Sequence, residues 1–170
     1  MNRLLGVVVL VVSLTGLGCR QVALEQVLTV TDTFTGWYHV GVVGDQEKLV
    51  PSLSFRLQNA GDEPLSRVQL LVSFWPNGAD GELDSKQITG LGPEELAPAA
   101  STEPILVRSD AGYTLDPPQT KDDLFMHSSF RDFTVKVFAR RDGRLVPLGE
   151  FPVERRVIPS AAPSTTTTVP

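Results

Sequence analysis

The chain has 170 residues, with 15 basic and 20 acidic side chains and a formal net charge of −5. Nucleic-acid binding requires clustered cations that displace counterions. The basic residues here occur singly or in isolated pairs, so no nucleic-acid partner is expected. The length suits one domain. Since the sequence holds a single cysteine, Cys19 cannot form an internal disulfide and needs another role.

The first 18 residues have the pattern of a signal peptide. Arg3 supplies the positive charge, and an almost unbroken apolar run from Leu4 to Leu17 precedes Gly18 and Cys19. The run is shorter than the ~20 residues that span a bilayer, so an uncleaved membrane helix is the less favoured alternative. We therefore expect residues 1–18 to be removed from the mature protein.

The predicted cleavage site resembles a bacterial lipobox, in which a small residue precedes a cysteine that receives diacylglycerol. Gly18 and Cys19 match this pattern, although Gly16 stands where a leucine is usual. The resemblance implies a lipid anchor at Cys19. Ordinary secretory cleavage is the alternative, because Gly16 and Gly18 also satisfy the small-x-small rule. Both interpretations predict an extracytoplasmic protein, and Arg20 slightly favours the outer membrane if the host is Gram-negative.

The rest of the chain alternates apolar and polar residues with period two, which is the pattern of strands with one buried and one solvated face. Asp142 and Gly143 lie between two such stretches and predict a hairpin with a type I′ turn. Seven or eight short strands with regular turns predict an all-β fold, an immunoglobulin-like two-sheet antiparallel sandwich. The expected strands are 26–34, 37–43, 53–58, 68–74, 85–89, 103–108, 133–140 and 145–153.

A biased segment ends the chain. Residues 159–170 (PSAAPSTTTTVP) contain too few apolar groups to offset the entropy of ordering them, so we expect a disordered tail. The predicted organisation is a signal peptide (1–18), a short tether from the lipidated cysteine (19–25), one β-sandwich domain (26–158) and the tail. A tether of this length would hold the domain close to the bilayer.

Residues 53–75 (LSFRLQNAGDEPLSRVQLLVSFW) combine a strand, an Asn-x-Gly turn at Asn59 and a strand that ends in aromatic residues. This segment resembles the second and third strands of immunoglobulin-like modules in bacterial envelope proteins, most closely the FxLYD type. Residues 96–99 (LAPA) stand in place of that family's Pro-Gly turn. The resemblance implies an immunoglobulin-like fold and a role as a scaffold or interaction domain, with no shared active site.

Neither histidine lies in a pattern typical of a catalytic or metal site. His39 and His127 have no cysteine, histidine or carboxylate at metal-ligand spacing. Asp122 and Asp123 lie near His127 but lack a paired nucleophile, so loop charge is the favoured interpretation. We predict no catalytic residue and no cofactor.

A second acidic segment faintly resembles a calcium loop. Its oxygen-bearing side chains are Asn77, Asp80, Glu82 and Asp84. The order of acidic residues, glycine and closing glutamate that an EF-hand requires is not met. A polar hairpin loop is therefore favoured, and we predict no metal site.

Residues 110–129 (DAGYTLDPPQTKDDLFMHSS) form the most irregular segment of the domain. Loops of this length in compact domains are usually functional or disordered. Two interpretations stay open. Leu124, Phe125 and Phe130 close the open end of the sandwich, or the loop is a docking surface. The candidate partner-binding residues for docking are Tyr113, Leu124, Phe125 and Met126.

These observations favour a non-enzymatic envelope lipoprotein that contacts the membrane through its lipid anchor and presents a β-sandwich to a protein partner, with a role in envelope assembly. The alternative is a small-ligand or calcium-binding module, and an unrecognised hydrolase is least favoured. A concave apolar pocket with converging polar groups would favour a ligand. An exposed apolar loop or an unpaired sheet edge would favour a protein partner.

Overall fold

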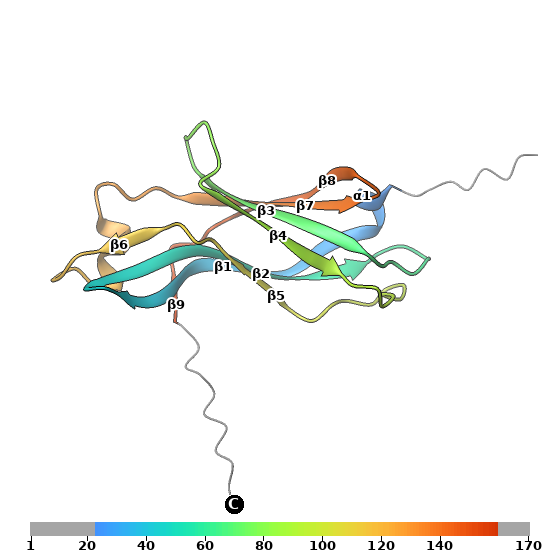
Figure 1. Ribbon diagram of the computed structural model, residues 1–170, viewed down its shortest axis with the longest axis horizontal. Coiled ribbons are helices and arrows are strands. Elements are labelled where there is room, and N and C mark those ends of the chain that lie inside the picture. The colour runs from blue at the N-terminus through green and yellow to red at the C-terminus, as the bar shows by residue number, and fades with distance from the viewer. Residues whose placement is uncertain (1–22, 160–170) are drawn as a thin grey trace, which may run out of the picture.

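The computed structural model describes residues 23–159, which form two β-sheets packed on one another (Figure 1). The predicted signal peptide, Cys19 and residues 160–170 of the predicted tail lie outside the described residues. One sheet has the strand order β5-β2-β1-β9, with β6 also paired to β2, and the other has the order β4-β3-β7-β8. The prediction of a mostly β, two-sheet sandwich is confirmed.

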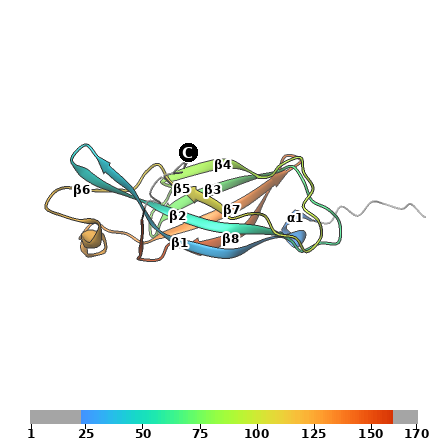
Figure 2. The same cartoon turned by 90° about the horizontal axis from the view of Figure 1, so that it is seen from below.

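The elements follow the chain in a simple order, and the bounds below are used throughout. They are α1 (Leu24–Val27), β1 (Leu28–Val43), β2 (Gln46–Asn59), β3 (Val68–Pro76), β4 (Asp84–Leu91), β5 (Ile105–Arg108), β6 (Tyr113–Leu115), the 3-10 helix η1 (Lys121–Met126), β7 (Phe133–Arg141), β8 (Arg144–Pro152) and β9 (Val157–Ile158). Figure 2 shows the two layers from a second direction.

The strands with the strongest alternation supply the core between the sheets. Their inward side chains are buried at every second position, as period two requires. Trp37 of β1, fully buried, adds the largest side chain to the same core. The alternating core residues are Leu53, Phe55, Leu57, Val68, Leu70, Val72, Phe74, Phe133, Val135, Val137 and Ala139.

The first strand differs from the prediction. The sequence predicted two strands, 26–34 and 37–43, whereas the structure has one continuous strand from Leu28 that follows a single helical turn, α1. The pairing of β1 with β2 is irregular between Thr31 and Phe34, where Asp32 has a positive φ of 50°. This bulge interrupts the alternation without ending the strand, and the pairing continues through residues 35 and 36, where a break was expected.

The N-terminal half of β2 was also missed. Residues 46–52 carry charged side chains at Glu47 and Lys48 and a proline at position 51, all of which are unusual in a strand interior. Pro51 lies where the pairing of β2 with β5 ends, so its missing N–H costs no hydrogen bond inside that ladder. Its carbonyl accepts a hydrogen bond from the Ser109 amide at 3.1 Å. The result is a long β1–β2 hairpin that projects beyond the core at one end of the sandwich (Figure 2).

Two further strands complete the first sheet. β6 pairs with β2 just beyond β5, and the chain reaches that position by passing very close to β2 at Gly112, where a Cβ atom would lie 2.1 Å from the Leu49 carbonyl oxygen. β9 pairs with β1 in parallel, Trp37 opposite Val157. The prediction of a fully antiparallel sandwich is therefore corrected, because the chain crosses from β8 to the other sheet and arrives there running in the direction of β1.

The two turns singled out by sequence are explained by local hydrogen bonds and backbone angles. Asp142 and Gly143 have φ values of 51° and 82°, as a type I′ turn requires. Asn59 is buried, and its side-chain amide donates to the carbonyls of Glu63 and Leu96 at 2.8 and 2.9 Å. The Asn-x-Gly motif thus ties two loops together. Ala99 has a positive φ of 62°, the conformation that a glycine would adopt more easily at this turn.

Candidate functional site

The two ends of the sandwich differ. α1, which follows the N-terminal residues, lies at one end, whereas β6, the tip of the β1–β2 hairpin and the segment after β6 lie at the other (Figures 1 and 2). Within residues 23–159, no helix is long and apolar enough to cross a membrane.

An aromatic cluster closes the end of the sandwich that carries β6. Trp37 stands at its centre, with ring centroids 5.4 Å from Tyr113, 5.3 Å from Phe130 and 5.4 Å from Phe133. Phe125 meets Phe130 edge to face at 5.4 Å. The Tyr113 hydroxyl donates to the Ser129 carbonyl at 3.2 Å, which pins the returning chain. Tilted and edge-on rings at these distances stabilise the closed end beyond the burial of their area.

The four predicted partner-binding residues therefore have different environments. Leu124 is 0% exposed and belongs to the core, and Tyr113 and Phe125 are partly buried against it. Met126 is 87% exposed. The structure brings the first three together as packing residues, and of the four only Met126 is mostly exposed to solvent. A docking role for this group stays a prediction, and the packing shows that most of it also supports the fold.

Polar contacts fix η1 in place. The Lys121 amide donates to a carboxylate oxygen of Glu47 in β2 at 2.6 Å, so η1 is tied to the β1–β2 hairpin close to its tip. The carboxylate of Asp123 accepts hydrogen bonds from the Thr120 amide and hydroxyl at 2.8 and 2.9 Å. These bonds hold the pKa of Asp123 below its ordinary value. Asp123 thus holds the start of η1.

The histidines do not meet. His127 Nδ1 lies 2.7 Å from the hydroxyl of Ser129, two residues away in its own loop. His39 lies in β1, and its Nε2 is buried with no hydrogen-bond partner among the described residues. The indole nitrogen of Trp37 is also buried and unpartnered within that part of the chain.

The side chains of the segment that faintly resembles a calcium loop do not converge on one point. Asn77 Oδ1 accepts a hydrogen bond from the Thr134 hydroxyl at 2.9 Å. The Asp84 carboxylate accepts one from the Asp110 amide, just after β5. Asp80 and Glu82 are exposed. Among residues 23–159, no three side chains of metal-ligating type lie close enough together to hold an ion.

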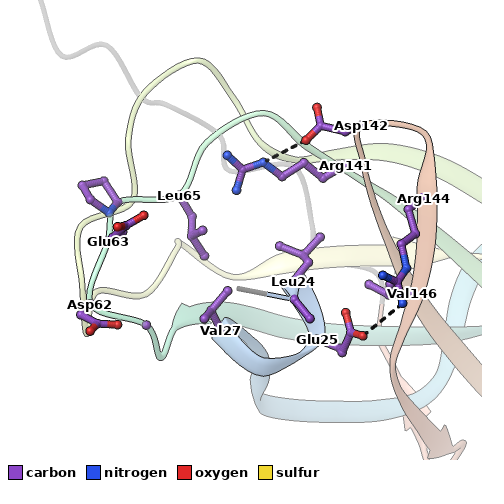
Figure 3. A pocket seen from close by; sticks show the side chains of 13 residues that line it. Leu24, Glu25, Val27, Asp62, Glu63, Leu65, Arg141, Asp142, Arg144 and Val146 are labelled. Atoms are coloured by element: carbon purple, nitrogen blue, oxygen red, sulfur yellow. Dashed lines mark ion pairs between the residues drawn. The ribbon is translucent and has the colours of Figure 1, made fainter. Parts of the chain in front are cut away.

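A pocket of about 520 Å³ lies at the end with α1 (Figure 3). Leu24, Val27, Leu65 and Val146 form its apolar part, and the rim includes an ion pair between Glu25 and Arg144 at 3.6 Å. This pair links α1 to β8 across the opening. We call this the α1 pocket.

A second cavity, of about 500 Å³, runs between the free edges of the two sheets. Residues 86–88 of β4 form one wall and residues 106–110 of β5 and its exit form the other, with Val40, Lys48 and Val50 added by the β1–β2 hairpin. Figure 2 shows β4 and β5 side by side. We call this cavity the edge groove. Two of its apolar side chains, Val40 and Leu106, are 42% and 52% exposed.

One end of the edge groove is closed by an ionic clamp. The carboxylate of Asp84 in β4 accepts hydrogen bonds from the Ser109 hydroxyl at 2.9 Å and from the Asp110 amide at 2.7 Å. Lys86 pairs with both Asp84 and Asp110. Burial raises the pKa of Asp84, but these hydrogen bonds and the Lys86 charge outweigh it, so the pKa lies below its ordinary value. The hydrogen bond from Lys86 to Asp110 raises the pKa of Lys86.

The other cations of the edge groove lack such partners. The Arg108 guanidinium stacks over the Tyr38 ring, 4.4 Å from its centroid. Among the described residues, neither Arg108 nor Lys48 forms an ion pair. Stacking on a ring holds a guanidinium in place while its N–H donors stay available, so this arrangement suits recognition of a carboxylate or another anion.

Sequence reasoning did not find the edge groove. Arg108 and Lys48 are 60 positions apart in the sequence, and strand pairing brings them to one face. The one available signal was weak: Leu106 and Arg108 alternate with the buried Val107, so the strand has an outward face that is part apolar and part basic.

The fold and this groove define a small β-sandwich domain with an open edge. Neither the known protein-family models nor the curated protein sequences contain a match to this chain. Among solved structures, it is similar to Northeast Structural Genomics Consortium target SoR45, with 13% identity, a TM-score of 0.43, and coverage of 85% of this chain and 94% of that one. The solution structure of AT1g01470 from Arabidopsis thaliana is similar with 12% identity, a TM-score of 0.41, and coverage of 80% and 83%.

A third similar structure is a calcium-binding mutant of Bacteroides uniformis β-glucuronidase 2, with 12% identity and a TM-score of 0.41. The match covers 74% of this chain and 13% of that one. The chain spans 15% of a second Bacteroides protein, so these two matches concern a small part of much larger chains. At this level of similarity the matches carry no information on what the protein binds.

Proposed function

We propose that the protein is a non-enzymatic envelope lipoprotein, anchored through Cys19, whose immunoglobulin-like β-sandwich binds a protein partner along the edge groove. The order β4-β3-β7-β8 supports the immunoglobulin-like assignment. In variable-type immunoglobulin domains, one sheet has an extra strand, C′, next to strand C, and β4 lies next to β3 in the same way. The lipid anchor and the FxLYD-type relationship are part of this proposal and rest on the sequence.

The observation that carries the proposal is the edge groove itself. It combines an open strand edge, the exposed apolar side chains of Val40 and Leu106, and two cations without a described ion-pair partner. An unpaired edge with adjacent apolar groups is a common feature of protein-binding surfaces and a liability for a domain that binds nothing. A small ligand is the less favoured alternative, because small-molecule sites usually enclose most of the ligand with converging polar groups.

The test is site-specific photocrosslinking in the native host. A photoreactive amino acid replaces Leu106 in the groove, and a control protein carries it at Leu145, which is 41% exposed on β8, the edge strand opposite β4. We expect one discrete crosslinked protein from position 106 and none from position 145. The Arg108→Glu change should abolish that crosslink.

Two results would refute the proposal. Identical crosslinks from positions 106 and 145 would mean nonspecific contact with the envelope. A crosslink that persists unchanged with Arg108→Glu would exclude the groove cation from recognition.

A further inference from the structure

We infer that the partner binds as an extended strand that alternates acidic and apolar residues and pairs with the free edge of β5, so that it lengthens the first sheet. This inference rests on the proposed function and specifies the chemistry of the partner. Its three supports are the direction of the backbone groups on β5, the contrast between β5 and the other sheet edges, and the charges along the groove.

The backbone of β5 has free hydrogen-bonding groups that face the groove. The Ser109 amide donates to Pro51 of β2, and Val107 is paired with Leu53 two positions earlier. Since backbone groups alternate along a strand, the amides and carbonyls of Leu106 and Arg108 point the opposite way, toward the groove. The next amide of this series, that of Asp110, points the same way and donates to Asp84 of β4. This bond shows that an amide on this side of the chain reaches across the groove to β4.

The other edges of the sheets are less suited to strand addition. In β8, Pro147 and Pro152 interrupt the outer edge, and the pairing with β7 is irregular between Val137 and Phe138. Prolines and bulges are devices that prevent edge pairing. β9 contains two residues and is followed by Pro159. The edge of β4 is occupied at its start by the clamp of Asp84 and Lys86.

The charges along β5 define the chemistry of the incoming strand. Its residues would alternate between the outer face, beside Leu106 and Arg108, and the inner face, beside Val107 and the inward-facing Ile88 of β4. An acidic residue on the outer face would pair with the Arg108 guanidinium. An apolar residue on the inner face would cover the gap between the sheet edges. A second copy of this chain fits less well, because the free segment of β4 is short of acidic residues beyond Asp84.

The test uses a capped decapeptide of alternating valine and glutamate and three matched peptides. In one, glutamine replaces glutamate, and in another, lysine replaces it. The third keeps the side chains but carries N-methyl groups on every second amide, along one edge. Binding to the full mature protein is measured by titration calorimetry, and amide hydrogen exchange is followed residue by residue.

We expect the glutamate peptide to bind at least ~10-fold more tightly than the glutamine peptide, because the charge-assisted pair with Arg108 is lost in the latter. Binding should slow the exchange of the Leu106 and Arg108 amides, and N-methylation should weaken binding by at least ~10-fold because it removes the ladder hydrogen bonds. With Arg108→Glu, the preference should invert in favour of the lysine peptide. Arg140→Glu, an exposed change at the end of β7, is the matched control and should alter nothing.

Each failure has a distinct meaning. Binding of the N-methylated peptide with unchanged affinity, or unprotected Leu106 and Arg108 amides in the complex, would overturn strand addition. Equal affinity for the glutamate and lysine peptides would overturn the acidic partner. The proposed function is tested separately by the crosslinking experiment. A discrete, Arg108-dependent crosslink from position 106 would show that the groove binds a protein even if strand addition or the acidic partner is wrong.

Discussion

The role of η1 is tested by truncating Leu124 to alanine. Leu124 is 0% exposed, although it lies in a segment that the sequence describes as an irregular loop. Removing three buried carbon groups at ~0.8 kcal/mol each costs about 2.4 kcal/mol of transfer free energy. The cavity left behind adds to this, as leucine-to-alanine changes in cores cost ~2–5 kcal/mol. We therefore expect Leu124→Ala to lower the free energy of unfolding by about 3 kcal/mol and Tm by roughly 10 °C.

The assay is urea unfolding followed by tryptophan fluorescence, because Trp37 sits in the aromatic cluster beside η1. Met126→Ala is the control in the same element, since its side chain is 87% exposed and its loss should change stability by less than about 0.5 kcal/mol. If both variants unfolded at the same urea concentration as the parent, η1 would contribute nothing to the core, and the account of the closed end would be wrong.

Three further predictions address other parts of the molecule. Leu70→Ala and Val137→Ala should each lower stability by ~1–4 kcal/mol in the same assay, and Ser54→Ala, on an outward face, should change little; equal effects would mean the strand registers are wrong. Asp84→Asn should cost about 1–2 kcal/mol near neutral pH. Because the pKa of Asp84 is depressed in the folded state, its stabilising effect is present above the unfolded pKa of about 4 and is lost as the pH falls through the folded pKa. The two proteins should therefore converge in stability in acid, and a difference that is independent of pH would contradict this account. Mass spectrometry of the native protein should find diacylglycerol on Cys19, and an unmodified N-terminal cysteine would leave ordinary secretion as the answer.

Local sequence pattern was sufficient where a strand has one buried and one solvated face. The alternation at 53–57, 68–74 and 133–139 predicted the core strands and their inward residues, because burial of one sheet face imposes period two on the sequence. Asp142 and Gly143 predicted their turn for an equally local reason, since few residues adopt positive φ easily.

Elements that depend on distant neighbours were missed. The N-terminal half of β2 contains Pro51 and two charged residues, and it is a strand because β1, β5 and β6 pair with it. β9 has two residues and no period of its own, and its parallel pairing follows from where the crossover from β8 ends. Such segments gain their hydrogen bonds from tertiary contacts, so no local sequence pattern predicts them.

The sequence by itself determined that this is a mostly β domain and which strand faces carry the core. It also predicts an export signal that ends at the single cysteine. Tertiary structure decided the rest. Of the two interpretations of the 110–130 segment, it showed that Leu124 and the aromatic side chains pack at the end of the sandwich, while a docking role stays a prediction. It also brought Lys48 and Arg108 to one groove beside the free edge of β5. The physical reason is that a local pattern reports which side of a strand is buried, whereas a binding surface depends on which strands lie next to each other.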